Sequence, residues 1–303
     1  MGSEIVSSRK ELPASTTPRI GLALGGGGAR GFAHLIALET LEELGVAPVA
    51  IAGTSIGAIF GAGAAAGLSA AHMRAHVEEV LSHRYALVRQ LFSVRAPPVE
   101  RLFNLLPVRA ALLDPEALLE AILPSRLPST FAALGLPLEV VATDFYAQVA
   151  VVLSEGPLRP AIAASMALPV IFQPVTLAGR VLMDGGLVDP LPYARLRQVA
   201  DVVIAIDVSG AGREPGEAMR PGAIEALLAA SQILQRSIVR EKLRTARPDI
   251  LLDMPSQGFG VLEFHRFRDI MAAAEPMREV LKRQLGRILN AETVEAKAIG
   301  LEP

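Results

Sequence analysis

Short apolar runs alternate with longer segments of helical periodicity along most of this chain. Each apolar run predicts a buried strand, and the segments between the runs repeat apolar residues at the three- and four-residue spacing of helices packed on a sheet. We expect strands at 19–24, 49–53, 138–144, 149–154, 174–183, 202–208 and 249–252, and helices at 30–44, 55–67, 69–83, 115–123, 158–167, 222–246 and 264–288. The alternation predicts a single-domain α/β fold with a mainly parallel sheet covered on both faces and a site at the carboxyl ends of the strands.

Three segments depart from this pattern. Residues 1–18 are polar and lack the apolar core of a signal peptide, so we expect a flexible N-terminal tail before a domain that spans 19–303. Between 85 and 128, prolines separate small apolar groups, and this region is either a cap over a site or an ordinary packed excursion. Residues 210–303 begin with an exposed loop and continue as the C-terminal helical part of the same domain.

Residues 49–71 are long and apolar enough to suggest a membrane span. Five glycines and a preceding strand pattern instead favour a buried strand, turn and helix. Gly53-Thr54-Ser55-Ile56-Gly57 lies at that turn, where small neighbours leave room for a sharp backbone and for a substrate. The motif predicts a nucleophilic Ser55, and a glycine-rich turn into a buried helix is the alternative.

A second glycine cluster, GGGGARG at 25–31, joins the first strand to the first helix. Successive glycines leave backbone N–H groups uncovered, so this loop can hold a phosphate or the oxyanion of a tetrahedral intermediate. The spacing Gly26-x-Gly28-x-x-Gly31 also fits the dinucleotide fingerprint, which expects an acidic residue about 20 positions later. The second strand ends in the serine turn instead, and this disfavours nucleotide binding.

A third cluster follows an apolar strand, where Asp184 stands before Gly185-Gly186. Two glycines let another backbone or a substrate come close to the carboxylate. Asp184 is therefore a candidate general base, although aspartate before two glycines is also ordinary turn chemistry. We interpret Asp189, which precedes a proline, as a turn residue.

Taken together, the motifs resemble the patatin-like phospholipase family, whose signature combines a GGGxRG loop, GxSxG, a small-residue Ser/Pro block and DG[AG]. These elements stand here in the family's order, as GGGARG at 26–31, GTSIG at 53–57, ASMALP at 164–169 and DGG at 184–186. The joint occurrence is far more specific than any single match. The resemblance spans roughly residues 19–208.

The resemblance implies a patatin-like three-layer α/β/α fold and a serine hydrolase of lipid acyl esters that uses a Ser-Asp dyad without histidine. By motif, Ser55 would be the nucleophile and Asp184 the base, and the oxyanion hole would be the amides of Gly26, Gly27 and Gly28. Arg30 would orient that loop or meet an anionic head group, with a surface charge at a helix end as the alternative. The remaining motif glycines are Gly31, Gly53, Gly57, Gly185 and Gly186. Such covalent catalysis needs no metal and no cofactor.

A dyad requires a more basic carboxylate than an ordinary aspartate, whose pKa is about 3.9. Partial burial would have to raise the pKa of Asp184. A Ser-His-Asp triad is the other chemistry, and His265 is the one histidine after Asp184. We interpret His265 as a partly exposed structural residue and place His34 near the glycine loop. The other histidines are expected to face solvent: His72, His76 and His83.

Composition narrows the function classes. The 303 residues are 51% hydrophobic, enough for a sizeable core, and a net charge of −2 gives no basic field for nucleic acid. Zero cysteines exclude disulfides and fit a reducing compartment, so we expect a cytoplasmic protein. The resemblance to lipid hydrolases adds the expectation that it meets lipid transiently at a membrane surface. The competing class is a non-catalytic lipid- or nucleotide-binding regulator on the same fold. The sequence leaves the lipid class, the bond cleaved and the oligomeric state open.

Overall fold

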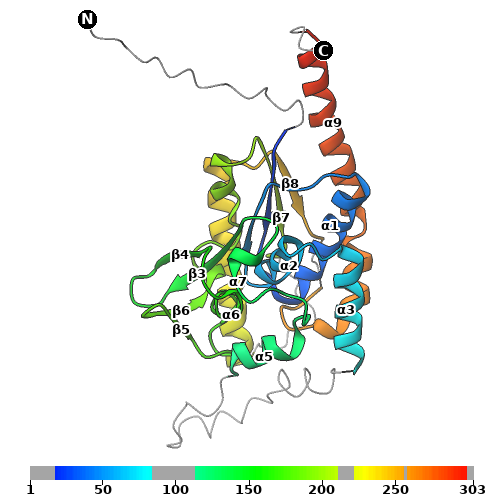
Figure 1. Cartoon of the computed structure of the whole chain (residues 1–303). Coiled ribbons are helices and arrows are strands. Elements are labelled where there is room, and N and C mark those ends of the chain that lie inside the picture. The colour runs from blue at the N-terminus through cyan, green and yellow to red at the C-terminus, as the bar shows by residue number, and fades with distance from the viewer. Residues whose placement is uncertain (1–17, 84–112, 211–221, 256–257, 299–303) are drawn as a thin grey trace, which may run out of the picture.

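The described part of the chain forms one eight-stranded sheet, in which the order is β5-β6-β3-β2-β1-β7-β8 and β4 pairs with β3 (Figure 1). The computed structural model describes residues 18–83, 113–210, 222–255 and 258–298. The strands are β1 (Ile20–Leu24), β2 (Ala50–Thr54), β3 (Leu138–Asp144), β4 (Val149–Leu153), β5 (Val175–Leu177), β6 (Arg180–Asp184), β7 (Val202–Asp207) and β8 (Ile250–Asp253).

Five strands form the parallel part of the sheet, namely β3, β2, β1, β7 and β8. At one end, β4 and β6 pair antiparallel with β3, and β5 pairs antiparallel with β6. Every residue of β1 and β2 is buried, as expected for parallel strands covered on both faces. The predicted α/β fold with a mainly parallel sheet is confirmed, with antiparallel strands added beyond β3.

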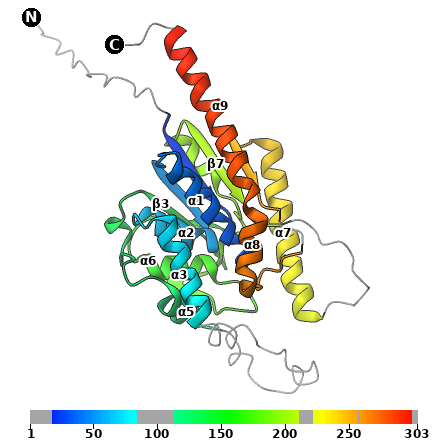
Figure 2. The ribbon, with the colours of Figure 1, turned by 90° about the vertical axis from the view of Figure 1, so that its right-hand side faces the viewer.

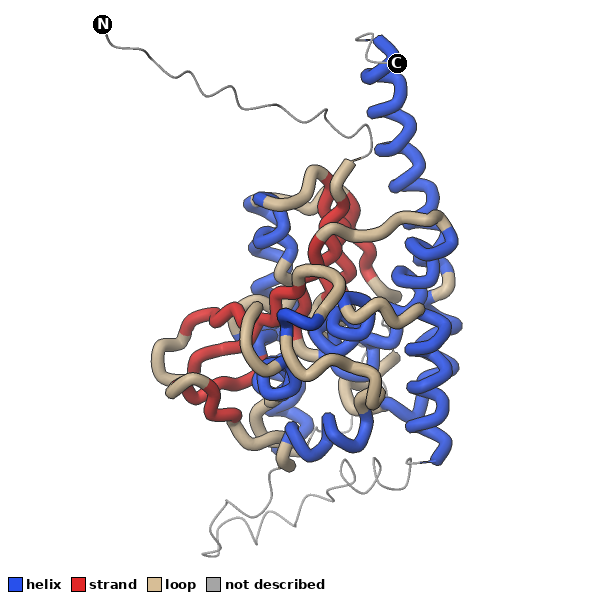
Figure 3. The backbone as a smooth tube through the Cα atoms, in the orientation of Figure 1, coloured by secondary structure: helices blue, strands red, loops and turns tan. Residues whose placement is uncertain are grey.

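Helices lie on both sides of the strands (Figure 3). The α-helices are α1 (His34–Glu43), α2 (Ile56–Ala65), α3 (Ala70–His83), α5 (Pro115–Ile122), α6 (Leu158–Met166), α7 (Ala223–Thr245), α8 (Phe267–Ala274) and α9 (Pro276–Ala298). The 3-10 helices are η1 (Gly28–Ala33), η4 (Phe131–Ala133), η5 (Gly185–Leu187), η6 (Tyr193–Gln198) and η7 (Phe264–Arg266). In Figure 1, α1 and α9 lie on one side of the strands and α7 lies on the other. Figure 2 shows α9 alongside α1.

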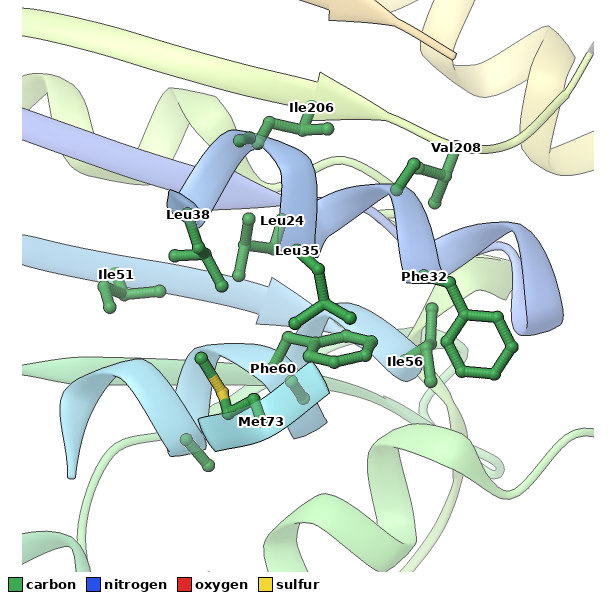
Figure 4. Close-up of a cluster of buried hydrophobic side chains, with 14 of the residues drawn as sticks. Leu24, Phe32, Leu35, Leu38, Ile51, Ile56, Phe60, Met73, Ile206 and Val208 are labelled. Carbon is green, nitrogen blue, oxygen red and sulfur yellow. The ribbon is translucent and has the colours of Figure 1, made fainter. Parts of the chain in front are cut away.

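Alternate residues of the central strands face two different cores. Leu24 and Ile51 belong to a larger core with α1, α2 and α3, where Phe60 packs between the helices and the sheet (Figure 4). Ala23 and Ala52 belong to a second core with η6 and α7. Because this second face carries alanines, the chain around η6 can lie close to the sheet. The sheet is thus the middle of three layers.

The structure corrects three predicted elements. The strand expected at 174–183 is the β5–β6 hairpin, because Ala178 and Gly179 adopt positive φ values of 49° and 74° and reverse the chain. The helix expected at 264–288 is broken into η7, α8 and α9, with a new helix starting at Pro276. The helix expected from residue 30 begins as η1 and becomes α-helical at His34.

Candidate active site

Ser55 lies at the turn between β2 and α2, and its backbone is strained. Its φ of 55° and ψ of −121° fall in a region that residues with a side chain rarely adopt. Close contacts make glycine necessary on both sides: a Cβ at Gly57 would lie 2.1 Å from the Leu24 carbonyl oxygen, and one at Gly53 would lie 2.6 Å from the Gly57 oxygen. The sharp strand-to-helix turn predicted from the motif is therefore present.

Ser55 and Asp184 meet because β2 and β6 end against neighbouring residues of the same strand. β2 runs parallel to β3, and its last residue, Thr54, pairs with Val141. β6 arrives from the opposite direction, and its last residue, Asp184, pairs with Ala142. Both occupy the same edge of β3, since β4 pairs along the other edge. Two strand ends that are far apart in the sequence thus come together without any loop between them.

The Ser55 hydroxyl donates a hydrogen bond directly to the Asp184 carboxylate, with 2.8 Å between Oγ and Oδ2. The other carboxylate oxygen, Oδ1, accepts from the Gly186 N–H at 2.7 Å. Thr143 Oγ1 donates to the main-chain carbonyl of Asp184 at 2.7 Å, which holds the end of β6 in place. The position of the carboxylate is therefore fixed by three groups that the fold supplies.

Asp184 is almost completely buried, at 3% exposure. Burial raises the pKa of its carboxyl to about 6, and the hydrogen bonds from Gly186 and Ser55 offset only part of this effect because they favour the ionised form. Such a carboxyl is mostly ionised at pH 7 and is far more basic than a solvated aspartate. Burial thus raises the pKa of Asp184, as a Ser-Asp dyad requires.

Ser165 of α6 binds the backbone of the strained turn at Ser55. Its hydroxyl accepts from the Ser55 backbone N–H at 2.8 Å and donates to the Val141 carbonyl at 2.6 Å. Ser165 is fully buried, so solvent water does not reach the two backbone groups that its hydroxyl binds. Ser165 therefore ties the backbone of Ser55 to β3.

We expect Ser165→Ala to lower kcat/KM for ester substrates about tenfold or more, because the Ser55 backbone loses its anchor. The free energy of unfolding should fall by about 1–3 kcal/mol as Val141 loses its buried donor. Thr40→Val is the control, since Thr40 is a buried hydroxyl that bonds to Ile36 inside α1. Equal activity of the Ser165 variant and this control would contradict the positioning role.

The glycine loop uses part of its backbone for structure. Gly26 N donates to the Pro190 carbonyl at 2.9 Å, and Ala29 N donates to the Val261 carbonyl at 2.8 Å. Between them, the N–H groups of Gly27 and Gly28 bind no acceptor among the described residues, and both glycines line the cavity beside Ser55. The prediction that Gly26 contributes an oxyanion donor is therefore corrected, because its N–H already has a partner.

Two buried side chains hold the glycine loop. Arg30 is 3% exposed and its Nε donates to the Gly27 carbonyl at 3.2 Å, so it is not a surface charge. It does not line the cavity, and the geometry favours the loop-orienting interpretation over contact with a head group. His34 Nε2 donates to the Gly25 carbonyl at 2.9 Å. Burial lowers the pKa of His34 to about 4, so the imidazole is neutral at pH 7.

The other motif glycines mark close approaches between elements. A Cβ at Gly31 would lie 2.3 Å from Ile56 Cγ2, and one at Gly185 would lie 2.1 Å from the Val141 carbonyl oxygen. A Cβ at Gly186 would lie 2.8 Å from the Gln235 side chain of α7. Glycine at these positions lets η1, α2, β3 and α7 meet around the serine and the aspartate.

Asp189 does more than make a turn. Its carboxylate pairs with Lys242 of α7 at 2.5 Å, and the same ammonium donates to the Leu191 carbonyl at 2.7 Å. The main-chain carbonyl of Asp189 accepts from Thr54 Oγ1 at 2.8 Å. Since Pro190 holds Gly26, this short segment connects α7 to both the end of β2 and the glycine loop.

The structure brings no described histidine onto Asp184 or Ser55. His265 lies exposed in η7. His76, which we expected to face solvent, is half-buried, lines the cavity and bonds through Nε2 to the Ile122 carbonyl at 2.8 Å. The side chain of His83 is outside the described residues. A histidine triad therefore has no geometric support in the described part of the chain.

A cavity of about 180 Å³ opens beside Ser55, Asp184, Gly27 and Gly28. Its walls are mostly apolar and come from α2, α3, α5, α7 and the segments around Met166 and Val261. Of the region 85–128, predicted as either a cap or an ordinary packed excursion, residues 85–112 lie outside the described residues. In the described remainder, α5 and the residues after it line the cavity with Leu118, Ile122, Leu123, Pro124 and Leu127.

The described residues offer no candidate for a membrane span or for a bound metal ion. No helix in these ranges combines the length and hydropathy that a membrane crossing requires. Nowhere in them do three or more His, Asp or Glu side chains gather in a way that could hold a metal ion.

Comparison with known proteins adds independent information. The sequence model of the family described as patatin-like phospholipase matches residues 22–196. An uncharacterized NTE family protein of Mycobacterium tuberculosis is 38% identical over 208 residues, which cover 68% of this chain and 54% of the relative. The human patatin-like phospholipase domain-containing protein 6 is 34% identical over 192 residues, 62% of this chain and 13% of that protein. The chain thus spans about half the length of its bacterial relatives.

Among solved structures, the chain is similar to VipD from Legionella pneumophila. The two share 14% sequence identity at a TM-score of 0.46, over 92% of this chain and 68% of VipD.

Proposed function

The chain belongs to the patatin-like phospholipase family, and we propose that it is a serine hydrolase that cleaves the acyl esters of lipids. The observation that carries the proposal is the direct hydrogen bond between Ser55 Oγ and the buried carboxylate of Asp184. In this proposal, Ser55 is the nucleophile and Asp184 is the general base. The amides of Gly27 and Gly28 stabilise the oxyanion, and Arg30 orients the loop that carries them.

The reaction takes two steps. Ser55 Oγ attacks the ester carbonyl and gives its proton to Asp184, while the carbonyl oxygen gains negative charge and accepts hydrogen bonds from the two loop amides. Asp184 then donates the proton to the oxygen of the leaving alcohol, and an acyl-enzyme remains on Ser55. Water attacks the acyl-enzyme and gives a proton to Asp184, and Asp184 passes this proton to Ser55 Oγ as the carboxylic acid leaves, which restores the serine.

The cavity supports a lipid as the acyl donor. Its walls on α2, α3 and α5 carry side chains such as Ile59, Phe60, Val77 and Leu118, which suit a hydrocarbon chain. An acyl chain in this position excludes water from Asp184, which keeps its pKa raised during the reaction. Transient contact with a membrane surface, from which the lipid would enter, belongs to the same proposal.

The test is the pH dependence of hydrolysis of a soluble acyl ester. Because Asp184 must be ionised to accept the proton, kcat/KM should be half-maximal at about pH 6 and should fall about tenfold per pH unit below it. Above about pH 7 the profile should be level. His265→Ala should keep this profile, since His265 is exposed and makes no contact with the dyad.

A midpoint near pH 4, the value of an ordinary aspartate, would contradict a base whose pKa is raised by burial. A large loss of activity in a folded His265→Ala variant would replace the dyad with a triad.

A further inference from the structure

One face of α7 turns polar side chains into the cavity. Leu228, Ser231, Gln232 and Gln235 line it, and their spacing of three, one and three residues places them on a single side of the helix. Elsewhere on α7, large apolar side chains are exposed: Ile233, on the opposite side, at 68%, and Leu227 and Leu234, on a flank three or four residues from Ser231, at 54% and 60%. In this part of α7, three of the four side chains that line the cavity are polar, while three large apolar side chains are exposed.

Burial favours the opposite choice of side chains at these positions. An amide or hydroxyl that leaves water without a strong new hydrogen bond costs about 1–3 kcal/mol, while an exposed leucine gives up a comparable gain. Packing therefore does not explain the polar face. Local departures of this kind are expected where a ligand supplies the missing partner.

Gln235 is the most deeply buried of these groups, at 7% exposure. Its Nε2 donates to Ser231 Oγ across a long 3.3 Å, and no hydrogen bond reaches its Oε1 from the described residues. The amide lies next to the dyad, because a Cβ at Gly186 would lie 2.9 Å from both Gln235 Nε2 and Asp184 Oδ1. A polar group with spare hydrogen-bonding capacity thus faces the cavity beside the carboxylate.

The position beside Asp184 identifies the side of the ester that Gln235 would meet. In the proposed reaction, Asp184 returns its proton to the oxygen of the leaving alcohol, so the alcohol lies beside Asp184 and the acyl chain takes the apolar walls of α2, α3 and α5. Among the described residues that line the cavity, Asp184 is the one carboxylate, and neither lysine nor arginine is present. The side-chain amides of Gln232 and Gln235 and the Ser231 hydroxyl, with no lysine or arginine beside them, suit an uncharged substrate group that can both donate and accept a hydrogen bond.

We propose that Gln235, assisted by Ser231, binds a free hydroxyl on the alcohol part of the substrate, so that the preferred substrates are acyl esters of glycerol with a free hydroxyl beside the ester. The inference rests on the proposed function and deepens it. Monoacylglycerols and lysophospholipids share this chemistry. Gln235 is thus a specificity-determining residue.

The test compares two decanoyl esters that differ by one group: ethylene glycol monodecanoate carries a hydroxyl where propyl decanoate carries a methyl. Wild type should prefer the glycol ester about tenfold or more in kcat/KM, the effect of one buried hydrogen bond. Gln235→Met keeps the length of the side chain and should bring this ratio to about one. The ratio is the readout because a general loss of activity affects both esters equally.

Two further variants complete the experiment. Ser231→Ala should lower the ratio by a smaller factor, and it tests the inference if the Gln235 variant does not fold. Gln284→Met makes the same change on α9, away from the cavity, and should leave the ratio of wild type. Monodecanoylglycerol and decanoyl lysophosphatidylcholine, assayed in parallel, distinguish the two sources of the glycerol hydroxyl by their relative kcat/KM.

A ratio near one in wild type, or a wild-type ratio in folded Gln235→Met and Ser231→Ala, would overturn the inference and leave the hydrolase standing. Absence of Ser55-dependent cleavage of every ester would instead reject the proposed function, and the inference would fail with it.

Discussion

Ser55→Ala is expected to lose at least about four orders of magnitude in kcat for acyl ester hydrolysis, because removal of a covalent nucleophile eliminates the acyl-enzyme route. The same variant should no longer react with a fluorophosphonate, whereas wild type should gain one adduct by intact mass. This probe reports an activated serine without knowledge of the natural lipid. The backbone of Ser55 keeps its bond to Ser165 in the variant, so the fold should persist.

Ser55→Gly provides a matched control with a distinct prediction. Glycine adopts the positive φ of 55° without strain, so this variant should be as inactive as the alanine variant and more stable than it by about 1–3 kcal/mol. The free energy of unfolding of the two variants, measured in denaturant, gives the comparison.

Ester turnover that survives in both Ser55 variants would show that another group carries the reaction. If wild type itself neither turns over esters nor takes the probe, the alternative of a non-catalytic lipid- or nucleotide-binding protein on this fold moves ahead.

Asp184→Asn is expected to lower kcat by about three orders of magnitude or more and to make the protein more stable at pH 7. The amide cannot accept the Ser55 proton, although it keeps an oxygen for the Gly186 N–H. The gain in stability follows from burial, because the folded protein holds the carboxyl at a pKa of about 6 against 3.8 for an unperturbed aspartate. That difference corresponds to about 3 kcal/mol at full ionisation.

The sign of this effect sets its pH window. A carboxyl whose pKa is raised on folding does not lower the free energy of unfolding below about pH 4. Its destabilising effect grows between about pH 4 and pH 6 and is constant at higher pH. The variant should therefore exceed wild type in stability at pH 7 to 8 and match it near pH 4. Comparing the variant with wild type at each pH cancels the titration of His34, which both proteins share.

If the stability difference between Asp184→Asn and wild type is the same at pH 7 and pH 4, folding does not raise the pKa of Asp184. A variant that keeps its activity would remove Asp184 from the mechanism altogether. Together with the Ser55 variants, this measurement separates a strained, buried dyad from a pair of ordinary turn residues.

The part of the fold that follows local pattern was predictable. Parallel strands such as β1 and β2 are apolar runs bounded by glycine, and the helices after them repeat at helical spacing, so sequence neighbours alone decide them. The β5–β6 hairpin was not, because residues 174–183 read as one apolar strand and the reversal at Ala178 depends on pairing with β3. The break before α9 does carry a local signal, because Pro276 stands at the first position of the new helix.

The same division holds for the site. By motif, the sequence alone identified Ser55, Asp184 and the glycine loop as candidates, since strained turns and close approaches demand particular residues whatever surrounds them. Tertiary structure decided what joins them: β2 and β6 meet on one edge of β3, Pro190 takes the Gly26 amide, and Ser165 holds the Ser55 backbone. It also put the polar face of α7 beside Asp184. Burial and hydrogen bonding depend on residues far apart in the chain, and no local pattern records which of them will meet.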